Sequence, residues 1–405
     1  MSFFDYFNIA IFWLIVWYRW LCYYRAPIAV LHTSPNHTIK NPSPQVSIII
    51  AARNEEKNIS KCVTSLLAQD YPNYEVIAVN DCSEDSTGQI LDRLAQSHSK
   101  LKVIHGKPLP EDWMGKAHAM YQGYQVAGGA WLLFTDADTF HGSSLLSSVM
   151  SRVLPSPFSF ATMYSKNLNA SFGQYLVDLA FSAYIFMISD PRNIMNPKSR
   201  QSLVNGQYLL FEKKAYELIG THQAIKGCSA DDVALGYLAK MKGFLPLVMM
   251  SGKGDLEANN YGTFWEAFLG GSRNLVIGPW TVLGPLRGSL LLVVLTVGLS
   301  FFWVVPWLTW LGGLETQNSA QSLVGFSQLT SGFAILWLIK RKVFRAFTDW
   351  LLMPVSFLLF VGMSFGGLIV SIYRGGAVWK GRVVSTLKPL PPWKPEPVRE
   401  RSPTP

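Results

Sequence analysis

The chain has 405 residues, of which 49% are hydrophobic and 15% charged, and its formal net charge is +9. A mean hydropathy of +0.19 is high for a soluble protein. Four scattered cysteines without a C-x-x-C pair disfavour a zinc site or a disulfide scaffold. The middle of the chain has no long basic run with interleaved aromatics, which disfavours nucleic acid as a partner. The apolar excess lies at the N-terminus and in the last third, which indicates a membrane-attached protein with one large soluble domain.

The first hydrophobic run is FNIAIFWLIVWYRWLCYY, residues 7–24. It is barely long enough to cross hydrocarbon, and Arg19 within it is expected to reach toward the interface. No small-residue cleavage site follows, so we predict an uncleaved membrane anchor over residues 1–30. A buried amphipathic helix would give the same pattern.

Residues 44–260 show short β-rich runs that alternate with stretches of helical spacing. Near-continuous apolar strands of this kind indicate a mostly parallel, Rossmann-like α/β sheet. The expected strands are residues 46–53, 74–81, 101–106 and 131–138, and the expected helices include residues 58–69 and 86–97.

Residues 261–285 are expected to form an amphipathic helix on the membrane surface. One predicted face is apolar and turned toward lipid, and another carries Glu266, Gly270 and Arg273. A core-packed helix fits the same periodicity. The apolar face is Phe264, Trp265, Phe268, Leu269, Leu275 and Val276.

Two to three membrane helices are predicted in residues 286–375, from apolar stretches at 289–311, 324–339 and 350–373. A basic, Pro-rich tail follows at residues 376–405. Positive charge marks both the run at 340–345 and this tail as cytoplasmic, yet one crossing by the third stretch would separate them. Pro354 and the pair Gly366–Gly367 keep a re-entrant or broken third segment open as an alternative.

Polar residues follow three of the four expected strands. The first strand runs into Arg53 and Glu55, the second into Asp81, and the fourth into Asp136 and Asp138. In doubly wound sheets, ligands bind at the carboxyl ends of the strands. In an extended chain, residues i and i+2 point to the same side, so the D-x-D pair suits a hard cation such as Mg²⁺ or Mn²⁺. A single strand-end aspartate is more often a cap or turn residue.

The ordered motifs SIIIAARNEEKNI, VIAVNDCSEDST, GKAHAM, LLFTDADT, VNGQYLLFEKKAYELIGTH and SADDVALGYLAKMKGF resemble the family 2 glycosyltransferases of GT-A fold. The resemblance covers residues 44–273, and the motifs are most similar to those of the membrane-bound branch associated with hopanoid and carotenoid glycosylation. It implies transfer of one sugar from a UDP-sugar, assisted by Mg²⁺ or Mn²⁺. It also implies an integral membrane protein whose catalytic domain faces the cytoplasm. An aromatic amphipathic helix followed by a span would place the site at the bilayer surface, so we expect a lipid hydroxyl as acceptor; carotenoid, sterol-like and hopanoid lipids fit, and so do a phospho-polyprenol or diacylglycerol.

The resemblance assigns a donor role to a set of strand-end and loop residues. Lys116 at a helix start would also read as an ordinary solvated lysine, and Arg273 as the partner of Glu266 on a helix surface. The expected donor residues are Ala52, Arg53, Glu55 and Asp81 for the nucleoside, Lys116 and Arg273 for the diphosphate, and Asp136 and Asp138 for metal and donor sugar, with Asp138 the direct metal ligand.

On the acceptor side, the resemblance makes Asp232 the general base, which takes the proton of the attacking hydroxyl. Gly206, Gln207 and Asp231 match the acceptor site. Two adjacent acids at a helix start are also favoured by the helix dipole, and an ordinary turn would explain Gly206 and Gln207.

The Q-x-x-R-W motif of processive family members is missing, and GGSRNL supplies only Arg273 near its place. This departure disfavours a processive polysaccharide synthase. A non-catalytic scaffold that binds nucleotide sugars is disfavoured because every acidic motif position is filled. A transporter is disfavoured because the spans lack paired internal carboxylates and an inverted repeat.

Overall fold

The computed structural model describes most of the chain beyond residue 42. The described residues are 43–168, 171–188, 191–194, 196–202, 204–259, 261–339, 347–379, 382–384 and 390–401, with 11, 14, 17, 18, 21 and 29–31. Apart from those early positions, the predicted anchor lies outside the described residues, and so does the basic run at 340–345.

The described residues contain one eight-stranded sheet, which is parallel except for one strand. The sequence prediction of a mostly parallel sheet is confirmed, and the four expected strands form β2, β3, β4 and β5 with ends trimmed by one or two residues. The antiparallel strand β9 lies between β5 and β7. In spatial order the strands are β1 (Ala29–Leu31), β10 (Pro246–Ser251), β7 (Phe160–Tyr164), β9 (Leu209–Glu212), β5 (Trp131–Asp136), β2 (Val46–Ala52), β3 (Tyr74–Asn80) and β4 (Leu101–His105).

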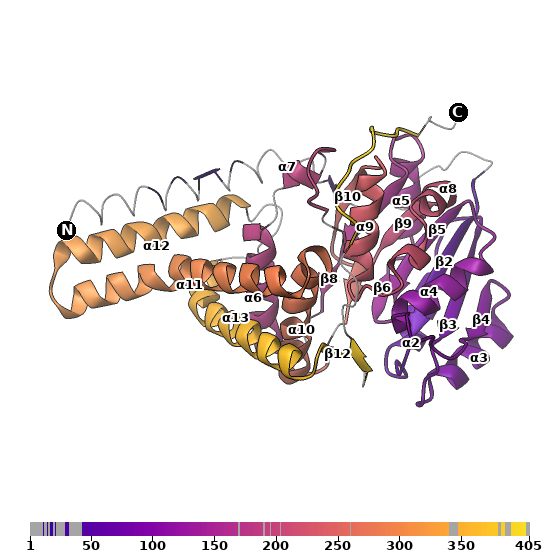
Figure 1. Ribbon diagram of the computed structural model, residues 1–405, viewed down its shortest axis with the longest axis horizontal. Helices are drawn as coiled ribbons and strands as arrows, with labels where there is room; N and C mark the ends of the chain where they lie inside the picture. Colours follow the sequence, from indigo (N-terminus) through magenta and orange to yellow (C-terminus); the bar gives the residue numbers. More distant parts are fainter. Residues whose placement is uncertain are drawn as a thin grey trace.

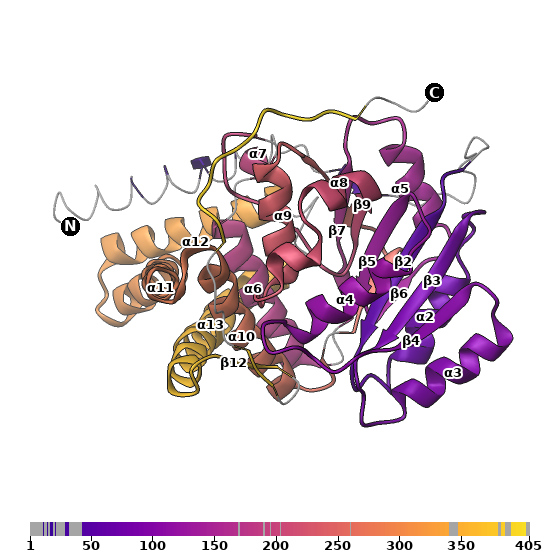
Figure 2. The same ribbon diagram turned by 45° about the vertical axis from the view of Figure 1, so that its right-hand side comes forward.

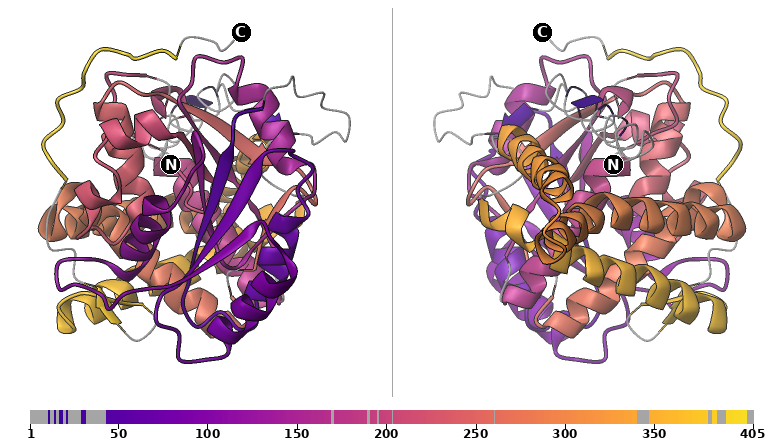
Figure 3. Two further views of the ribbon diagram at one scale, coloured as in Figure 1. Left: turned by 90° about the vertical axis from the view of Figure 1, so that its right-hand side faces the viewer. Right: turned by 90° about the vertical axis from the view of Figure 1, so that its left-hand side faces the viewer.

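Helices cover both faces of this sheet (Figures 2 and 3). One face packs against α2 (Ile59–Leu67), α3 (Thr87–Ser97) and α5 (Leu145–Val153). The other packs against α4 (Gly115–Gln125), α8 (Lys213–Leu218) and α9 (Asp231–Met241). The expected helices at 58–69 and 86–97 are confirmed as α2 and α3.

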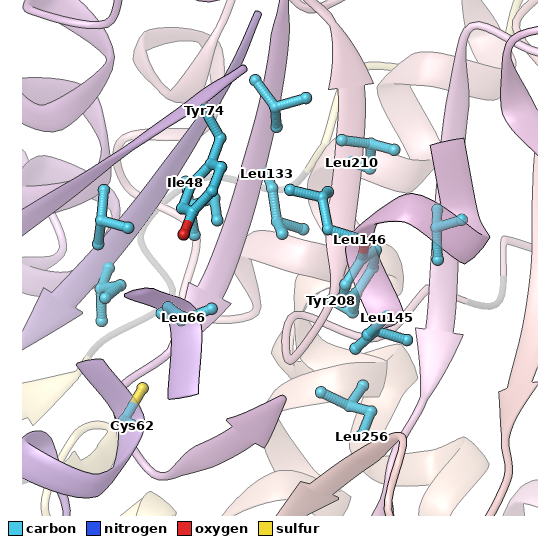
Figure 4. Close-up of a cluster of buried hydrophobic side chains, with 14 of the residues drawn as sticks. Ile48, Cys62, Leu66, Tyr74, Leu133, Leu145, Leu146, Tyr208, Leu210 and Leu256 are labelled. Carbon is cyan, nitrogen blue, oxygen red and sulfur yellow. The ribbon is translucent and has the colours of Figure 1, made fainter. Parts of the chain in front are cut away.

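The strands alternate between the two apolar layers, as side chains in a strand must. In β2, Ile48 and Ile50 join the layer under α2 and α5, whereas Ile49 joins the layer under α4. Figure 4 shows the first layer, where Ile48 and Leu133 from the sheet lie with Leu66 and Leu145 from the helices. This packing holds the carboxyl ends of β2, β3 and β5 at one edge.

A three-stranded sheet of β6 (Thr139–His141), β11 (Leu256–Ala258) and β8 (Lys166–Asn167) follows the end of β5. Because β5 ends at Asp136, residues 137–138 form a turn into β6. The expectation that Asp136 and Asp138 share one side of an extended strand is therefore wrong. The turn, not the strand pleat, sets the direction of Asp138.

The remaining helices gather beside the sheet domain (Figure 1). A third apolar cluster joins α6, α10, α11 and α13. One stretch of the described residues, Leu351–Tyr373 with a mean hydropathy of 2.2, is long and apolar enough to cross a membrane, and Pro285–Gly298, the first part of α11, is a shorter apolar stretch. These helices are α6 (Phe172–Ile188), α7 (Pro191–Ile194), α10 (Phe264–Leu283), α11 (Pro285–Glu315), α12 (Ser319–Ile339) and α13 (Phe347–Tyr373).

The predicted amphipathic segment is α10, but its apolar residues do not share one outward face. Trp265 and Leu269 are exposed, as expected, whereas Leu275 and Val276 are fully buried in the third cluster. That part of the expectation is wrong. Small residues on the buried face let α10 approach its neighbours closely, since Gly271 packs against α13 and α6.

The tail returns to the sheet domain after α13. A short hairpin of β12 (Ala377–Trp379) and β13 (Arg382–Val384) comes first. Residues 390–401 then run in irregular conformation over α9 and toward α5, as Figure 2 shows. The third apolar stretch, offered above as re-entrant or broken, is one continuous helix that contains Pro354.

Candidate active site

Lys116 lies at the centre of a cluster of carboxylates. Its Nζ atom is 2.7 Å from Asp136 Oδ1, at the end of β5, and 3.5 Å from Asp231 Oδ2, at the start of α9. Burial alone would lower the pKa of Lys116, but Asp136, Asp231 and Asp232 outweigh it and raise that pKa. The lysine therefore stays protonated and joins two elements that are about a hundred residues apart in sequence. The reading of Lys116 as a solvated surface lysine is excluded by this geometry.

Asp232 is held by two backbone N–H groups. Its Oδ2 accepts from Gly206 N at 2.9 Å, and its Oδ1 accepts from Val233 N at 2.7 Å. Burial, together with the neighbouring Asp231 carboxylate, raises the pKa of Asp232 to about 6. A carboxylate in a fixed orientation with this pKa has the properties of a general base at neutral pH.

Gly206 brings the NGQ loop against this carboxylate. A Cβ atom at this position would lie 3.1 Å from Lys116 Nζ and 3.3 Å from Asp232 Oδ2. A side chain would therefore crowd the lysine and the carboxylate at once. The side chain of Gln207 accepts from Ser165 Oγ and from Asn205 Nδ2, the latter at 3.1 Å, and its backbone oxygen accepts from Thr135 Oγ1 at 2.7 Å.

Asp138 faces the cluster from the turn after β5. Its Oδ1 atom is buried and has no hydrogen-bond partner among the described residues. Burial, with Asp136 and Glu55 nearby, raises the pKa of Asp138 to about 7. A divalent cation at this oxygen would remove both penalties, so the residues present fit a metal ion.

The metal would draw few of its ligands from the protein. Among the described residues, no group of three or more His, Cys, Asp or Glu side chains is arranged to hold a metal ion. Mg²⁺ and Mn²⁺ bound to nucleotides usually take one or two carboxylates, with phosphate oxygens and water completing the shell. Asp138 suits that role better than Asp136, whose Oδ1 is already paired with Lys116.

The loops after β2 and β3 are tied together at the same edge of the sheet. Arg53 donates to the backbone oxygens of Asp81 at 2.9 Å and Cys82 at 3.0 Å. Glu55 N donates to Thr87 Oγ1 at 2.8 Å, and the buried Asp81 lies at the end of β3 next to Ala52, whose oxygen accepts from Asp81 N. The guanidinium of Arg53 is thus used inside the protein to shape these loops.

Arg273 reaches the site from α10. Burial lowers the pKa of Arg273, and the nearby Tyr261 and Asp136 act in the opposite direction. Glu266 accepts instead from Gly262 N and Thr263 N in a capping box at the start of α10. The competing interpretation, an Arg273–Glu266 pair on the helix surface, is therefore not what the described contacts show.

Two residues that the motif reasoning missed lie next to Asp231. The Tyr216 hydroxyl accepts from His222 N at 3.0 Å and lies 2.6 Å from His222 Nδ1. The histidine Nε2 lies 3.9 Å from Asp231 Oδ2. Burial lowers the pKa of His222 to about 3, so the ring is neutral. A single His in the GTH turn gave no sequence signal for this arrangement.

A pocket of about 430 Å³ opens beside Asp138, between α2 and the small sheet. Both polar and apolar side chains line it. They include Asn58, Lys61, Phe140, Lys166, Glu257 and Asn259.

Comparison with known families agrees with this geometry. Residues 47–205 match the family model described as Glycosyl transferase family 2. These residues are thus similar to the catalytic domain of the family 2 glycosyltransferases over about two fifths of the chain. The match includes β2 to β7 and every predicted donor residue except Arg273.

Two curated relatives of this family 2 domain act on lipids according to their names. The chain is 35% identical to a beta-monoglucosyldiacylglycerol synthase from Nostoc sp. strain PCC 7120 over 128 residues, 30% of this chain and 27% of that protein. It is 36% identical over 107 residues to the 4,4'-diaponeurosporenoate glycosyltransferase of Staphylococcus aureus strain N315, 26% of this chain and 27% of that one. The chain thus spans about a quarter of these relatives.

A solved structure shares the fold over most of the chain. The mannosyltransferase PcManGT from Pyrobaculum calidifontis, in complex with GDP-Man and Mn²⁺, superposes with a TM-score of 0.51 and 16% identity. The superposition covers 88% of this chain and 96% of that one. At this identity the likeness establishes the fold alone, an α/β GT-A-like fold.

Proposed function

We propose that the protein is a membrane glycosyltransferase that moves a single sugar from a nucleotide sugar, a UDP-sugar, to the hydroxyl group of a lipid such as a carotenoid or hopanoid. The observation that carries this proposal is the Lys116 cluster, which joins the D-x-D turn to Asp231 and Asp232. A donor end and a base end are then held side by side, as an inverting displacement requires.

The base end of the site is the carboxylate of Asp232. With its carboxylate oriented by Gly206 N and Val233 N, Asp232 accepts the proton of the lipid hydroxyl as that oxygen attacks the anomeric carbon. Asp231 pairs with Lys116 and keeps it in place without taking part in proton transfer. The glycosidic bond forms from the acceptor oxygen, and the bond to the nucleoside diphosphate breaks.

The donor end of the site is inferred from its positively charged side chains. Lys116 and Arg273 are cations positioned to bind the diphosphate as it leaves. Asp138 would hold the divalent metal, Mg²⁺ or Mn²⁺, which supplies Lewis-acid stabilisation of the diphosphate when bound. The loops at Ala52, Glu55 and Asp81 would hold the nucleoside, beside the same edge of the sheet.

A lipid acceptor is supported by position and by the names of the relatives. The α10 helix carries Arg273 toward the site and also exposes Trp265 and Leu269. The mouth of the site would then lie at the bilayer surface, with the sheet domain on the cytoplasmic side, residues 261–285 at the interface and residues 286–375 as the C-terminal membrane-attached region. Diacylglycerol and a carotenoid acid appear in the names of the two relatives.

The test is product formation. Purified protein is incubated with UDP-sugars, Mg²⁺ or Mn²⁺ and a host lipid extract, and lipids are analysed by mass spectrometry. The proposal predicts a lipid whose mass has grown by one sugar, and no product when the metal is chelated. A polymer, or no consumption of any nucleotide sugar, would contradict it.

A further inference from the structure

We infer that α13, the most apolar long helix, lies along the lipid surface without crossing the bilayer, and that its outer face is a lipid-binding surface. This inference rests on the proposed membrane function. The side of the membrane on which each flank of α13 lies decides whether the helix crosses.

The tail after α13 is docked on the sheet domain. Glu396 N donates to Met241 O at 2.8 Å, and Arg399 N donates to Gly243 O at 2.9 Å, both at the end of α9. Lys242 and Glu396 form an ion pair at 2.7 Å. These contacts place residues 396–399 on the helix whose first turn carries the proposed base.

Further contacts hold the tail on the sheet domain on either side of residues 396–399. The Tyr237 hydroxyl donates to Pro391 O at 2.9 Å, and its ring packs edge-on against Trp393 at 5.2 Å. Arg401 donates to backbone oxygens of Val153 and Leu154 near the end of α5. Residues 390–401 are therefore on the same side of the membrane as the sheet domain, because no bilayer can separate segments in direct contact.

The number of crossings between α10 and this tail must then be even. The helices α11 and α12 form a tight antiparallel pair, since a Cβ atom at Gly325 would lie 2.4 Å from Trp310 N and one at Gly313 would lie 2.4 Å from Ser322 N. Two helices so closely paired cross together or not at all, and their contribution is even. A crossing by α13 would make the total odd and put the tail on the wrong side.

The packing of α13 fits a helix that lies against protein on one side and lipid on the other. Its inner face, with Phe357, Phe360 and Met363, is buried in the third cluster. Its outer face is an apolar stripe at helical spacing, made of Leu351, Val355, Leu358, Phe365, Ile369 and Ile372, all exposed. Figure 1 shows the turn between α11 and α12 projecting beyond the end of α13.

The positive charge on both flanks of α13 also supports a helix that does not cross. The basic run at residues 340–345 precedes α13, and Lys394, Arg399 and Arg401 follow it. Positive charge marks both flanks as cytoplasmic. These two assignments conflict only if α13 crosses. A helix on the surface leaves both flanks on one side, with the cations next to anionic headgroups.

The test places one cysteine on each flank and uses Cys82, which is exposed on the sheet domain, as the internal reference. The background is Cys22→Ser, and Cys62 and Cys228 are buried. Val343→Cys and Lys394→Cys are introduced singly, and sealed vesicles are labelled with a membrane-impermeant maleimide. The protein is first washed with carbonate on the same vesicles.

The inference predicts that both new cysteines label together with Cys82 from the same side, before any detergent is added. Labelling of Val343→Cys and Lys394→Cys from opposite sides would overturn it. Release of the protein by the carbonate wash would instead contradict the proposed membrane function, so the two failures are distinguishable.

Discussion

The sheet domain and the helical region differ in the exposure of their large apolar side chains. In described residues 43–168 and 204–259, the exposed large apolar side chains are Val126 and Leu218. In α11 and α13 such side chains are frequent, and some are almost fully exposed, as with Leu286 at 85% and Tyr373 at 90%. Large apolar patches on a protein surface mark a site of contact with lipid or with another protein.

The two regions also differ in how they place buried charges. In the sheet domain, Lys116 pairs with Asp136 and Asp231, and Asp232 accepts hydrogen bonds from two backbone N–H groups. In α13, Asp349 is buried but accepts a hydrogen bond from the Tyr175 hydroxyl of α6. This difference supports the proposal that the sheet domain carries the reaction site and that the helical region contacts lipid.

The charge cluster gives the largest expected effect. In Lys116→Gln, Asp136, Asp231 and Asp232 lose their shared cation, and the leaving diphosphate loses a positive partner. We expect the rate of glycolipid formation to fall by about 10² to 10³-fold. The control is Lys102→Gln, which removes a surface lysine paired with Glu75 and should leave the rate within about twofold. Equal losses in the two variants would contradict a special role for Lys116.

A pair of apolar substitutions tests the difference in burial between the sheet domain and α13. Ile49→Ala empties a site at 0% exposure between β2 and Gly123 of α4, and should lower the free energy of unfolding by about 2 to 5 kcal/mol. Leu358→Ala removes a side chain that is 64% exposed, so its cost in detergent should be under about 0.5 kcal/mol. Denaturant melts of the purified variants measure both. A similar cost for the two would mean that α13 faces protein on its outer side.

The pH dependence follows from Asp232. Its pKa is raised from 3.8 to about 6, and the base must be ionised, so the rate is full above about pH 7 and is lost as the pH falls through 6. At pH 5 about a tenth of the sites would be active. A kcat/KM profile from pH 5 to 8 checks this. A rate that stays flat down to pH 4.5 would exclude this carboxylate as the base.

The smallest effect is expected at the start of α10. Glu266→Ala removes the half of the capping box that accepts from Gly262 N and Thr263 N, and should cost about 1 kcal/mol locally. Hydrogen exchange at the first turn of α10 would rise, while exchange in β2 would not. The control Glu315→Ala, an exposed residue at the end of α11, should leave both unchanged. Faster exchange in β2 would show that the two regions are coupled more tightly than their separate cores suggest.

The sequence predicts the elements of the sheet domain well because alternation and strand-end polarity are local signals. Asp136 lies at the end of β5, where strand-end polarity placed it, and Lys116 joins it to Asp231 at the start of α9. The direction of Asp138 was missed, because a two-residue turn leaves no periodicity.

Specific side-chain contacts account for the rest of what sequence reasoning missed. The Tyr216–His222 pair forms across a local turn that a single histidine does not signal, and the ion pair of Lys242 with Glu396 joins distant segments whose sequences carry no shared pattern. The burial of Leu275 and Val276 depends on which helix covers α10, which amphipathic spacing does not determine.

The most direct measurement pairs donor affinity with transfer rate in Asp232→Asn. This change keeps the shape of the side chain and removes the negative charge of the carboxylate whose two oxygens accept from Gly206 N and Val233 N. The account predicts that the Kd for the nucleotide sugar, measured by calorimetry with Mg²⁺, stays within about twofold, while glycolipid formation falls by about 10² to 10⁴-fold. Full activity in Asp232→Asn would contradict the account.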